Sequence, residues 1–302
     1  MPGKAANLPA VGGAVRYQDD AGPLTSGKSC RYFTNGNGIL THMNPPSFTI
    51  DHAEPFPHLS KAPLVEAVIE FRARAADGFD EASSRGHFES KLTGYSFLDS
   101  SRTFQHSSKL ENGELTTQVE DLGWKGMRFQ SNDKTRIIQL NRDGFVFSHL
   151  RPYTAWQDFS TEALALWDVY RAIASPADVQ RTGLRYINRI PLTQESTDLD
   201  TILQKGPTLP AGLTSLPVLE FLQQETLFVP GTPYLVRLAR TLPPTLQDSG
   251  QEPGIIFDID VFCSQVTDPE PAVLRPILED LRWLKNKAFF GTLTKEALEQ
   301  LK

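Results

Sequence analysis

The feature that most constrains the fold is a period-two alternation of apolar and charged side chains, which recurs in several short segments. In the segment 64–74, Ile69 and Phe71 alternate with Glu66 and Glu70. Successive side chains of a β-strand point to opposite faces of a sheet, so this pattern predicts strands with one buried and one charged face. Sheets with one solvated face are commonly antiparallel, because parallel sheets are covered on both faces. The alternation therefore predicts antiparallel sheets.

Turn signals separate several of the predicted strands. Asn132-Asp133 joins the segments 116–131 and 135–150, and Asp143-Gly144 divides the second segment into two strands. Such pairs between alternating segments favour hairpins. The remaining strands that we expect lie at 64–74, 181–192, 218–229, 234–242 and 254–264.

Apolar residues at helical spacing predict helices between these strands. The clearest is the segment 159–175, which Asp158 or Ser160 can cap. Shorter helices are expected at 81–92 and 198–206. The C-terminal segment 271–302 is expected to be a long helix broken at Gly291-Thr292, with Thr292 or Thr294 capping its last piece.

The order strand, helix, strands, helix occurs twice along the chain, at about 63–176 and 177–302. We therefore predict an α+β fold, with antiparallel sheets backed by helices and two similar halves joined into a saddle or an incomplete barrel. No repeat of residues accompanies this order, so the similarity is expected in topology only.

The first 58 residues differ from the rest, because they are rich in Gly, Pro, Ser and Asn and show no sustained period. Such a segment buries too little apolar surface to offset its ordering entropy, so we expect it to be disordered or extended. Met43 is an alternative start of the chain. The ordered α+β domain is expected at 59–302.

Composition and charge narrow the class of protein. The 302 residues carry a net charge of −6 with a pI of about 5.6, which argues against non-specific nucleic-acid binding. Two cysteines, Cys30 and Cys263, form no disulfide framework or metal knuckle and suit a reducing compartment. No apolar run approaches the ~20 residues that span a bilayer. We expect a cytoplasmic protein that needs no membrane and no cofactor.

The segment RTGLRYINRI carries the first candidate site. It places Arg181, Arg185 and Arg189 on one strand face, about 13 Å apart at ~3.3 Å per residue. Two interpretations remain open. The arginines form exposed cross-strand pairs with acidic residues, or they line a charged concave sheet that binds phosphate or carboxylate groups bidentately. The acidic candidates are Glu66 and Glu70 on the first strand and Asp258 and Asp260 on the last, whose oxygens also suit Mg²⁺.

Tyr186 and Asn188 lie on the other face of that strand, which is the expected core face. A buried amide must be hydrogen-bonded, so Asn188 either makes a structural bond or contacts a ligand beside Tyr186. The six histidines show no metal-ligand spacing, and no phosphate-binding loop or nucleophile elbow is present. These motifs therefore identify no catalytic residue.

The segments PLVEAVIEFR and GLRYINRI, with HLRPYTAWQDF and the ending FFGTLT, resemble a sporadically distributed family of uncharacterised prokaryotic proteins. The resemblance runs from about Leu59 to the C-terminus and implies no established activity. Sporadic distribution is typical of horizontally exchanged genes, such as those of defence or toxin–antitoxin loci.

Two functional hypotheses follow. The first is a binding or regulatory protein that acts through a protein partner in such a locus. Trp124, Tyr153 and Trp156, which lie near arginines, are typical of protein interfaces, although a core position is the alternative for both tryptophans. The second is an enzyme or binding cup for a phosphorylated or carboxylated small molecule, using the charged sheet.

Overall fold

The computed structural model describes residues 48–111, 114–153, 155–192, 198–243 and 253–302. Residues 1–47, including the alternative start at Met43, lie outside the described ranges, and so does most of the segment predicted to be disordered or extended. Its remaining part, residues 48–58, has no helix or strand and contacts the helix α3, Pro271–Thr292. There the Phe56 ring stacks on Phe290 with the ring centres 5.4 Å apart.

The strands within the described residues form one antiparallel sheet of nine strands, in the order β2-β3-β4-β5-β1-β6-β9-β8-β7. The predicted antiparallel pairing and the helices beside it are confirmed, but the described strands form a single sheet rather than several. The strands are β1 Leu64–Arg72, β2 Tyr95–Glu111, β3 Glu114–Ser131, β4 Arg136–Asn141, β5 Gly144–Leu150, β6 Arg181–Pro191, β7 Phe221–Phe228, β8 Tyr234–Leu242 and β9 Gly254–Cys263.

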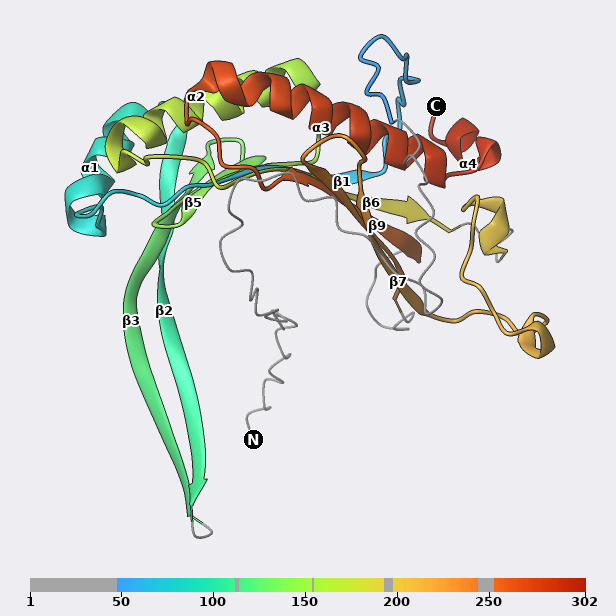
Figure 1. Cartoon of the computed structure of the whole chain (residues 1–302), viewed down its shortest axis with the longest axis horizontal. Coiled ribbons are helices and arrows are strands. Elements are labelled where there is room, and N and C mark those ends of the chain that lie inside the picture. The colour runs from blue at the N-terminus through green and yellow to red at the C-terminus, as the bar shows by residue number, and fades with distance from the viewer. Residues whose placement is uncertain (1–47, 112–113, 154, 193–197, 244–252) are drawn as a thin grey trace, which may run out of the picture. The chain divides into compact units, whose positions relative to one another are not determined.

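The described α-helices lie over one face of the sheet; we call the opposite face, over which none of them lies, the open face (Figure 1). The sheet curves so that its open face is concave and its covered face is convex. The helices are α1 Glu81–Lys91, α2 Trp156–Ala174, α3 Pro271–Thr292 and α4 Lys295–Gln300. Two 3-10 turns, Leu199–Thr201 and Ala211–Leu213, precede β7. Among the described helices, none is long and apolar enough to cross a membrane.

Aromatic side chains fill the space between the sheet and α2. The Trp167 ring lies 4.9 Å from Phe71 of β1 and 5.9 Å from Phe145 of β5, and Tyr170 stacks on it at 5.3 Å. All four side chains are fully buried. The predicted alternation in β1 is confirmed from Ala67 to Phe71.

Val65 departs from that alternation, because it is exposed rather than buried with its period-two neighbours. The pairing of β1 with β6 shifts register between Leu64 and Glu66. A β-bulge of this kind inserts one extra residue and reverses the facing of side chains before it. The buried residue of this pair is therefore Leu64.

The predicted N-terminal cap is wrong for helix α2 and right for helix α4. The helix α2 begins at Trp156, its N-cap is Ala155, and no side chain caps it, so the prediction of Asp158 or Ser160 was wrong. Tertiary packing decides this end, because the buried Trp156 ring donates from Nε1 to Glu279 Oε1 at 2.7 Å. The predicted cap Thr294 is confirmed, since its side chain accepts from the Ala297 backbone N–H at 3.1 Å.

Candidate functional site

The arginines of β6 contact acidic residues on neighbouring strands of the open face. Arg181 Nη2 lies 2.8 and 2.9 Å from the two carboxylate oxygens of Asp260, and its Nη1 contacts Glu70. Arg185 Nε lies 2.8 Å from Asp258 Oδ1. Antiparallel pairing of β6 with both β1 and β9 brings these side chains together. The cross-strand pairs expected as one interpretation of the sequence are thus present.

The Arg181 cluster, which we define as Arg181, Glu70 and Asp260, is partly buried, and Glu70 is its most exposed member. The Arg181 side chain is 13% exposed and that of Asp260 is 15% exposed. The Arg181 guanidinium carbon lies 4.4 Å from the centre of the Phe262 ring. Gly183 leaves the space that the guanidinium fills, because a Cβ there would lie 2.3 Å from Arg181 Nη1. The cluster is therefore packed as part of the sheet surface.

The other charged candidates lie on the same face. The hydrogen bond to Asp258 is the main cause that raises the pKa of Arg185, and the charge of Glu66 makes a smaller contribution in the same direction. The Arg189 side chain lies against Gly254, where a Cβ would be 3.2 Å from its Cγ. Within the described ranges, no group of three or more acidic, His or Cys side chains is arranged to hold a metal ion. The carboxylates of Glu70, Asp258 and Asp260 face arginines instead.

Tyr186 and Asn188 lie on the opposite, helix-covered face of β6, and both are buried. The Asn188 amide donates from Nδ2 to the Phe257 carbonyl oxygen at 3.1 Å, which is the structural bond expected as one alternative. The Tyr186 hydroxyl is hydrogen-bonded to the Tyr153 hydroxyl at 2.8 Å. The predicted candidates are therefore divided between two faces of the sheet and do not form one site.

Tyr186 and Asn188 line a pocket of about 1230 Å³ between α3 and residues 52–64, which we call the α3 pocket. The sequence did not predict it, because the segment 52–58 was assigned to the disordered or extended tail. Much of its wall is aromatic, from Phe56, Tyr153, Trp156, Tyr186, Trp283 and Phe290.

Lys285 of α3 also lines this pocket. Its Nζ lies 4.1 Å from the centre of the Tyr186 ring and 2.5 Å from Asn286 Oδ1. Burial, and to a smaller extent the charge of Arg282, lowers the pKa of Lys285 to about 7. The pocket thus contains an ammonium group that loses part of its charge near neutral pH.

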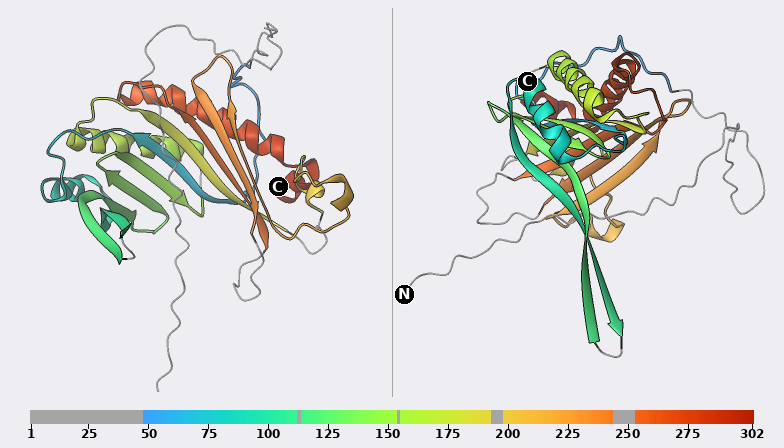
Figure 2. Two further views of the ribbon diagram at one scale, coloured as in Figure 1. Left: turned by 60° about the horizontal axis from the view of Figure 1, so that its bottom comes forward. Right: turned by 90° about the vertical axis from the view of Figure 1, so that its left-hand side faces the viewer.

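A third region is a two-stranded arm formed by β2 and β3. These strands are 17 and 18 residues long, whereas β4 pairs with β3 only from Gly126 to Gln130. The remaining length projects from the sheet, as Figures 1 and 2 show. We define the arm as residues 102–111 and 114–124.

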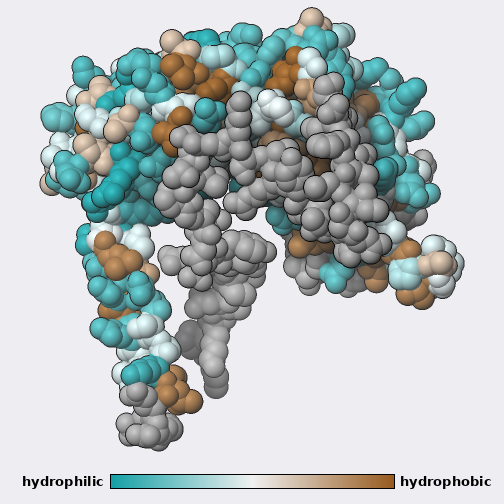
Figure 3. Space-filling view, viewed as in Figure 1, coloured by the Kyte–Doolittle hydropathy of each residue, from teal (hydrophilic) through white to brown (hydrophobic). Residues whose placement is uncertain are grey.

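The two faces of the arm differ in composition, and four exposed apolar side chains lie on one of them, which we call the apolar face. Phe104, Val119, Leu110 and Leu115 belong to cross-strand pairs that are two or four residues apart, so they share a face. The same face also carries Asp121, His106, Ser108 and Thr117. Their exposed fractions are 53% to 69%. The other face carries Gln105, Ser107, Lys109, Thr116, Gln118 and Glu120. Figure 3 shows apolar residues in brown along the arm, among polar residues in teal.

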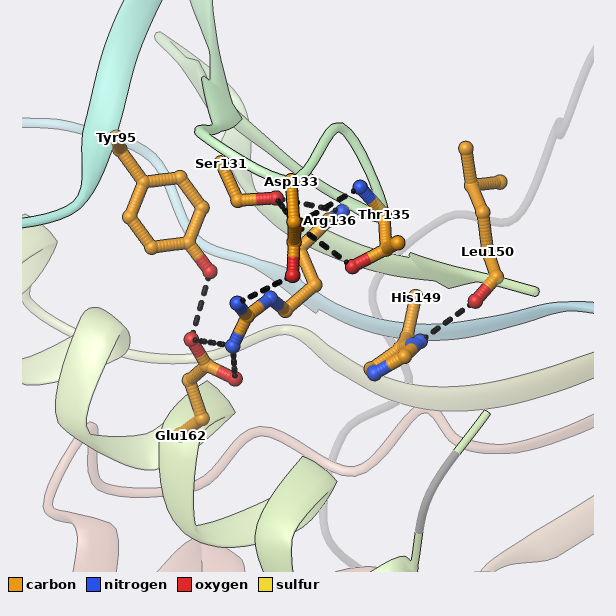
Figure 4. Close-up of polar contacts among 8 residues, drawn as sticks. All are labelled: Tyr95, Ser131, Asp133, Thr135, Arg136, His149, Leu150 and Glu162. Carbon is orange, nitrogen blue, oxygen red and sulfur yellow. Dashed lines mark hydrogen bonds and ion pairs between the residues drawn. The ribbon is translucent and has the colours of Figure 1, made fainter. Parts of the chain in front are cut away.

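A polar cluster joins α2 to the end of β2 and β3 that lies away from the arm (Figure 4). Tyr95, the first residue of β2, donates to Glu162 Oε1 at 2.7 Å. Arg136 of β4 lies 3.1 Å from both oxygens of the same carboxylate and 3.0 Å from Asp133. Burial and the bond to Glu162 raise the pKa of Tyr95, so its hydroxyl stays protonated and donating. His149, shown in the same figure, is buried and bonded to the Leu150 carbonyl oxygen at 2.7 Å.

We expect Arg136→Met to lower the free energy of unfolding by about 1 to 2 kcal/mol, because it leaves the partly buried Glu162 without its bidentate partner. Urea denaturation measures this change. Arg142→Met, an exposed substitution in the following turn, is the control and should stay within about 0.5 kcal/mol of the unchanged protein. Equal losses in the two variants would contradict a bridging role for Arg136.

Comparison of the sequence with protein-family models and with curated proteins gives no match. The function is therefore argued from the three regions described above.

Proposed function

We propose that the protein is a binding protein that acts through a protein partner, and that the apolar face of the arm is its contact surface. The observation that carries this proposal is that four exposed apolar side chains of the arm lie on one of its faces. Exposed apolar patches rimmed by polar residues are typical of interaction sites.

The free energy of burying apolar side chains favours a complex in which a partner covers the apolar face of the arm. Burying a leucine, valine or phenylalanine side chain contributes about 1.5 to 3 kcal/mol relative to leaving it exposed. Phe104, Leu110, Leu115 and Val119 are all more than half exposed. An isolated two-stranded hairpin is only marginally stable in water, and a covered apolar face is what stabilises such strands. A partner that covers this face would therefore order the arm while gaining affinity from it.

The setting that we propose is a mobile defence or toxin–antitoxin type locus, where the protein would neutralise or regulate its partner. This setting rests on the resemblance carried by PLVEAVIEFR and GLRYINRI. The arm supports the binding role.

The alternative function, an enzyme or cup that binds a phosphorylated or carboxylated molecule on the concave sheet, has less support. Arg181 and Arg185 already contact carboxylates, so an anion on that face would have to displace Asp260 or Asp258. Displacement leaves a carboxylate without its partner, which opposes binding.

The test replaces the four apolar residues of the arm face together, as Phe104→Thr, Leu110→Thr, Leu115→Thr and Val119→Thr. Threonine keeps the preference for a strand and removes most of the apolar surface. The full chain is affinity-purified from cells that carry its neighbouring genes and is analysed by native mass spectrometry. The matched control carries Gln105→Thr, Lys109→Thr and Gln118→Thr on the polar face.

We expect the unchanged protein and the control to retain a stoichiometric second polypeptide. The apolar-face variant should bind it at least about 100-fold more weakly, because several buried side chains are lost at once. Retention of the partner by the apolar-face variant would contradict the proposed surface. A complex that contains only copies of this chain would contradict a role through a different partner.

A further inference from the structure

The α3 pocket has a charge that differs in sign from that of the chain. The whole protein has a net charge of −6. The charged residues that line the pocket are four cationic and two anionic, a net charge of +2: Lys61, Arg151, Arg282, Lys285, Glu54 and Glu279. A concave, positively charged surface attracts anions even when the protein as a whole repels them.

Most of these charged groups already have structural roles. Glu279 accepts from Trp156 and lies 3.4 Å from Arg282, and Glu54 pairs with Lys287 at 2.6 Å. Arg151 donates to the backbone carbonyl oxygens of Pro63 and Leu64. These contacts hold the pocket walls together and neutralise both carboxylates.

Lys285 differs from these groups. Within the described chain, its polar contacts are with the Asn286 side-chain oxygen and the Tyr186 ring, and neither partner carries a negative charge. Lys285 is partly buried. Charges that are removed from water in proteins are normally paired, because desolvation without a counter-ion is unfavourable. An ammonium group in a pocket without a carboxylate partner is therefore an incomplete ion pair.

We infer that the α3 pocket binds a small organic molecule that carries a carboxylate or phosphate group, and that Lys285 binds this anionic group. The aromatic wall suits an apolar or aromatic body, since ligand pockets combine apolar walls with a few polar groups that fix orientation. The Tyr153–Tyr186 hydroxyl pair lies beside Lys285 and supplies further hydrogen-bonding groups. This inference is independent of the arm and of its partner.

The charge of Lys285 sets the expected pH dependence. The titratable and charged groups around it are Arg282 and Glu279 on α3, Tyr186 on β6, Arg151 and Tyr153 after β5, and His52, Glu54, His58 and Lys61 on the segment before β1. Only the protonated lysine attracts an anion, and its pKa in the free protein is about 7. Affinity should therefore fall above pH 7, by up to about tenfold per pH unit.

The test is isothermal titration calorimetry of the full chain with benzoate, phenyl phosphate and, as a neutral probe, benzyl alcohol. We expect at least one of the two anions to bind at least about tenfold more tightly than benzyl alcohol. The tighter anion distinguishes a carboxylate site from a phosphate site. Benzoate is used for the pH series if it binds, because its charge is constant between pH 6 and pH 9; otherwise phenyl phosphate is used above pH 7.

Substitutions identify the group responsible. Lys285→Met should weaken binding of the anion at least about tenfold, and Lys295→Met, which removes an exposed lysine outside the pocket, should leave it unchanged. Lys285→Arg should bind the anion at pH 7 and lose the fall in affinity between pH 7 and 9, because arginine stays charged. Circular dichroism melting checks that each variant is folded.

Three results would overturn the inference. The first is that neither anion binds more tightly than benzyl alcohol. The second is that folded Lys285→Met binds the anion as tightly as the unchanged protein. If Lys285→Met does not fold, the arginine variant decides, and a pH profile identical to that of the unchanged protein would remove Lys285 from the site.

Discussion

Replacement of Arg181 by methionine is expected to lower the free energy of unfolding by about 2 to 4 kcal/mol. The substitution leaves Glu70 and Asp260 facing one another without the guanidinium that lies between them. Removing one partner of a buried ion pair typically costs about 3 to 5 kcal/mol, and the contacts of Glu70 with Arg72 and of Asp260 with Arg237 reduce this value. Chemical denaturation monitored by tryptophan fluorescence measures the loss.

Two further variants separate this effect from a general loss of charge. Arg185→Met removes an arginine from the same strand and face, but its side chain is 49% exposed, so we expect a loss of about 1 kcal/mol or less. Adding Glu70→Gln and Asp260→Asn to Arg181→Met should restore at least half of the lost stability, because no unpaired carboxylate remains. A triple variant as unstable as the single one would show that Arg181 acts through packing on Phe262 rather than through charge.

Gly144→Ala is expected to lower the free energy of unfolding by about 3 kcal/mol or more. Gly144 has a φ of +146°, a backbone conformation that residues with a side chain rarely adopt. A Cβ at this position would lie 2.3 Å from the Phe71 carbonyl oxygen and 3.0 Å from the Arg72 Cα atom. Both atoms belong to the backbone of β1, which has strands on both sides and cannot move without disturbing them.

Gly78→Ala is the matched control for the backbone term alone. Gly78 also has a positive φ, +92°, but a Cβ there would meet no atom within 4 Å. Its loss should be about 1 to 2 kcal/mol. Thermal and urea unfolding of both variants give the comparison. Equal losses would mean that β1 accommodates the added methyl group and that the contact with Phe71 is unimportant.

The period-two pattern predicted much of this fold, because the face of the sheet to which a side chain points depends only on its position along its own strand. The placement of Glu70, Arg185 and Asp258 on a charged face follows from parity along each segment. Which strands lie side by side is not local, since β1 pairs with β6 from a distant part of the sequence. The sequence therefore predicted the ion pairs only as one of two alternatives. The prediction of two similar halves stays a prediction.

The strand β2 shows what local reasoning missed. Its segment YSFLDSSRTFQHSSKLE has no side that is apolar throughout, because its outer part leaves the sheet and has no core to face. The Asn112-Gly113 dipeptide between Leu110 and Leu115 is a signal that predicts a hairpin at this point. The period-two pattern alone does not predict the arm.

No local sequence pattern predicts the α3 pocket. Lys285 stands in a helix with ordinary charge spacing, and nothing in the neighbouring residues shows that it lacks a carboxylate partner. That property depends on Tyr186 from another strand and on residues 52–64. Residues 52–58 belong to a Pro-rich segment, and this composition favoured a disordered or extended tail. That prediction gave no indication that these residues lie beside α3.

The central β1–β6 pair also affects events during synthesis of the chain. Ile69 pairs with Leu184, about 115 residues later in the sequence. At a translation rate of about 5 to 20 residues per second, β1 waits on the order of 10 seconds for this partner. During that interval β1 is an open strand edge, on which another nascent chain can pair. Charged side chains oppose such pairing, so Glu66, Glu70 and Arg72 protect the strand before β6 exists.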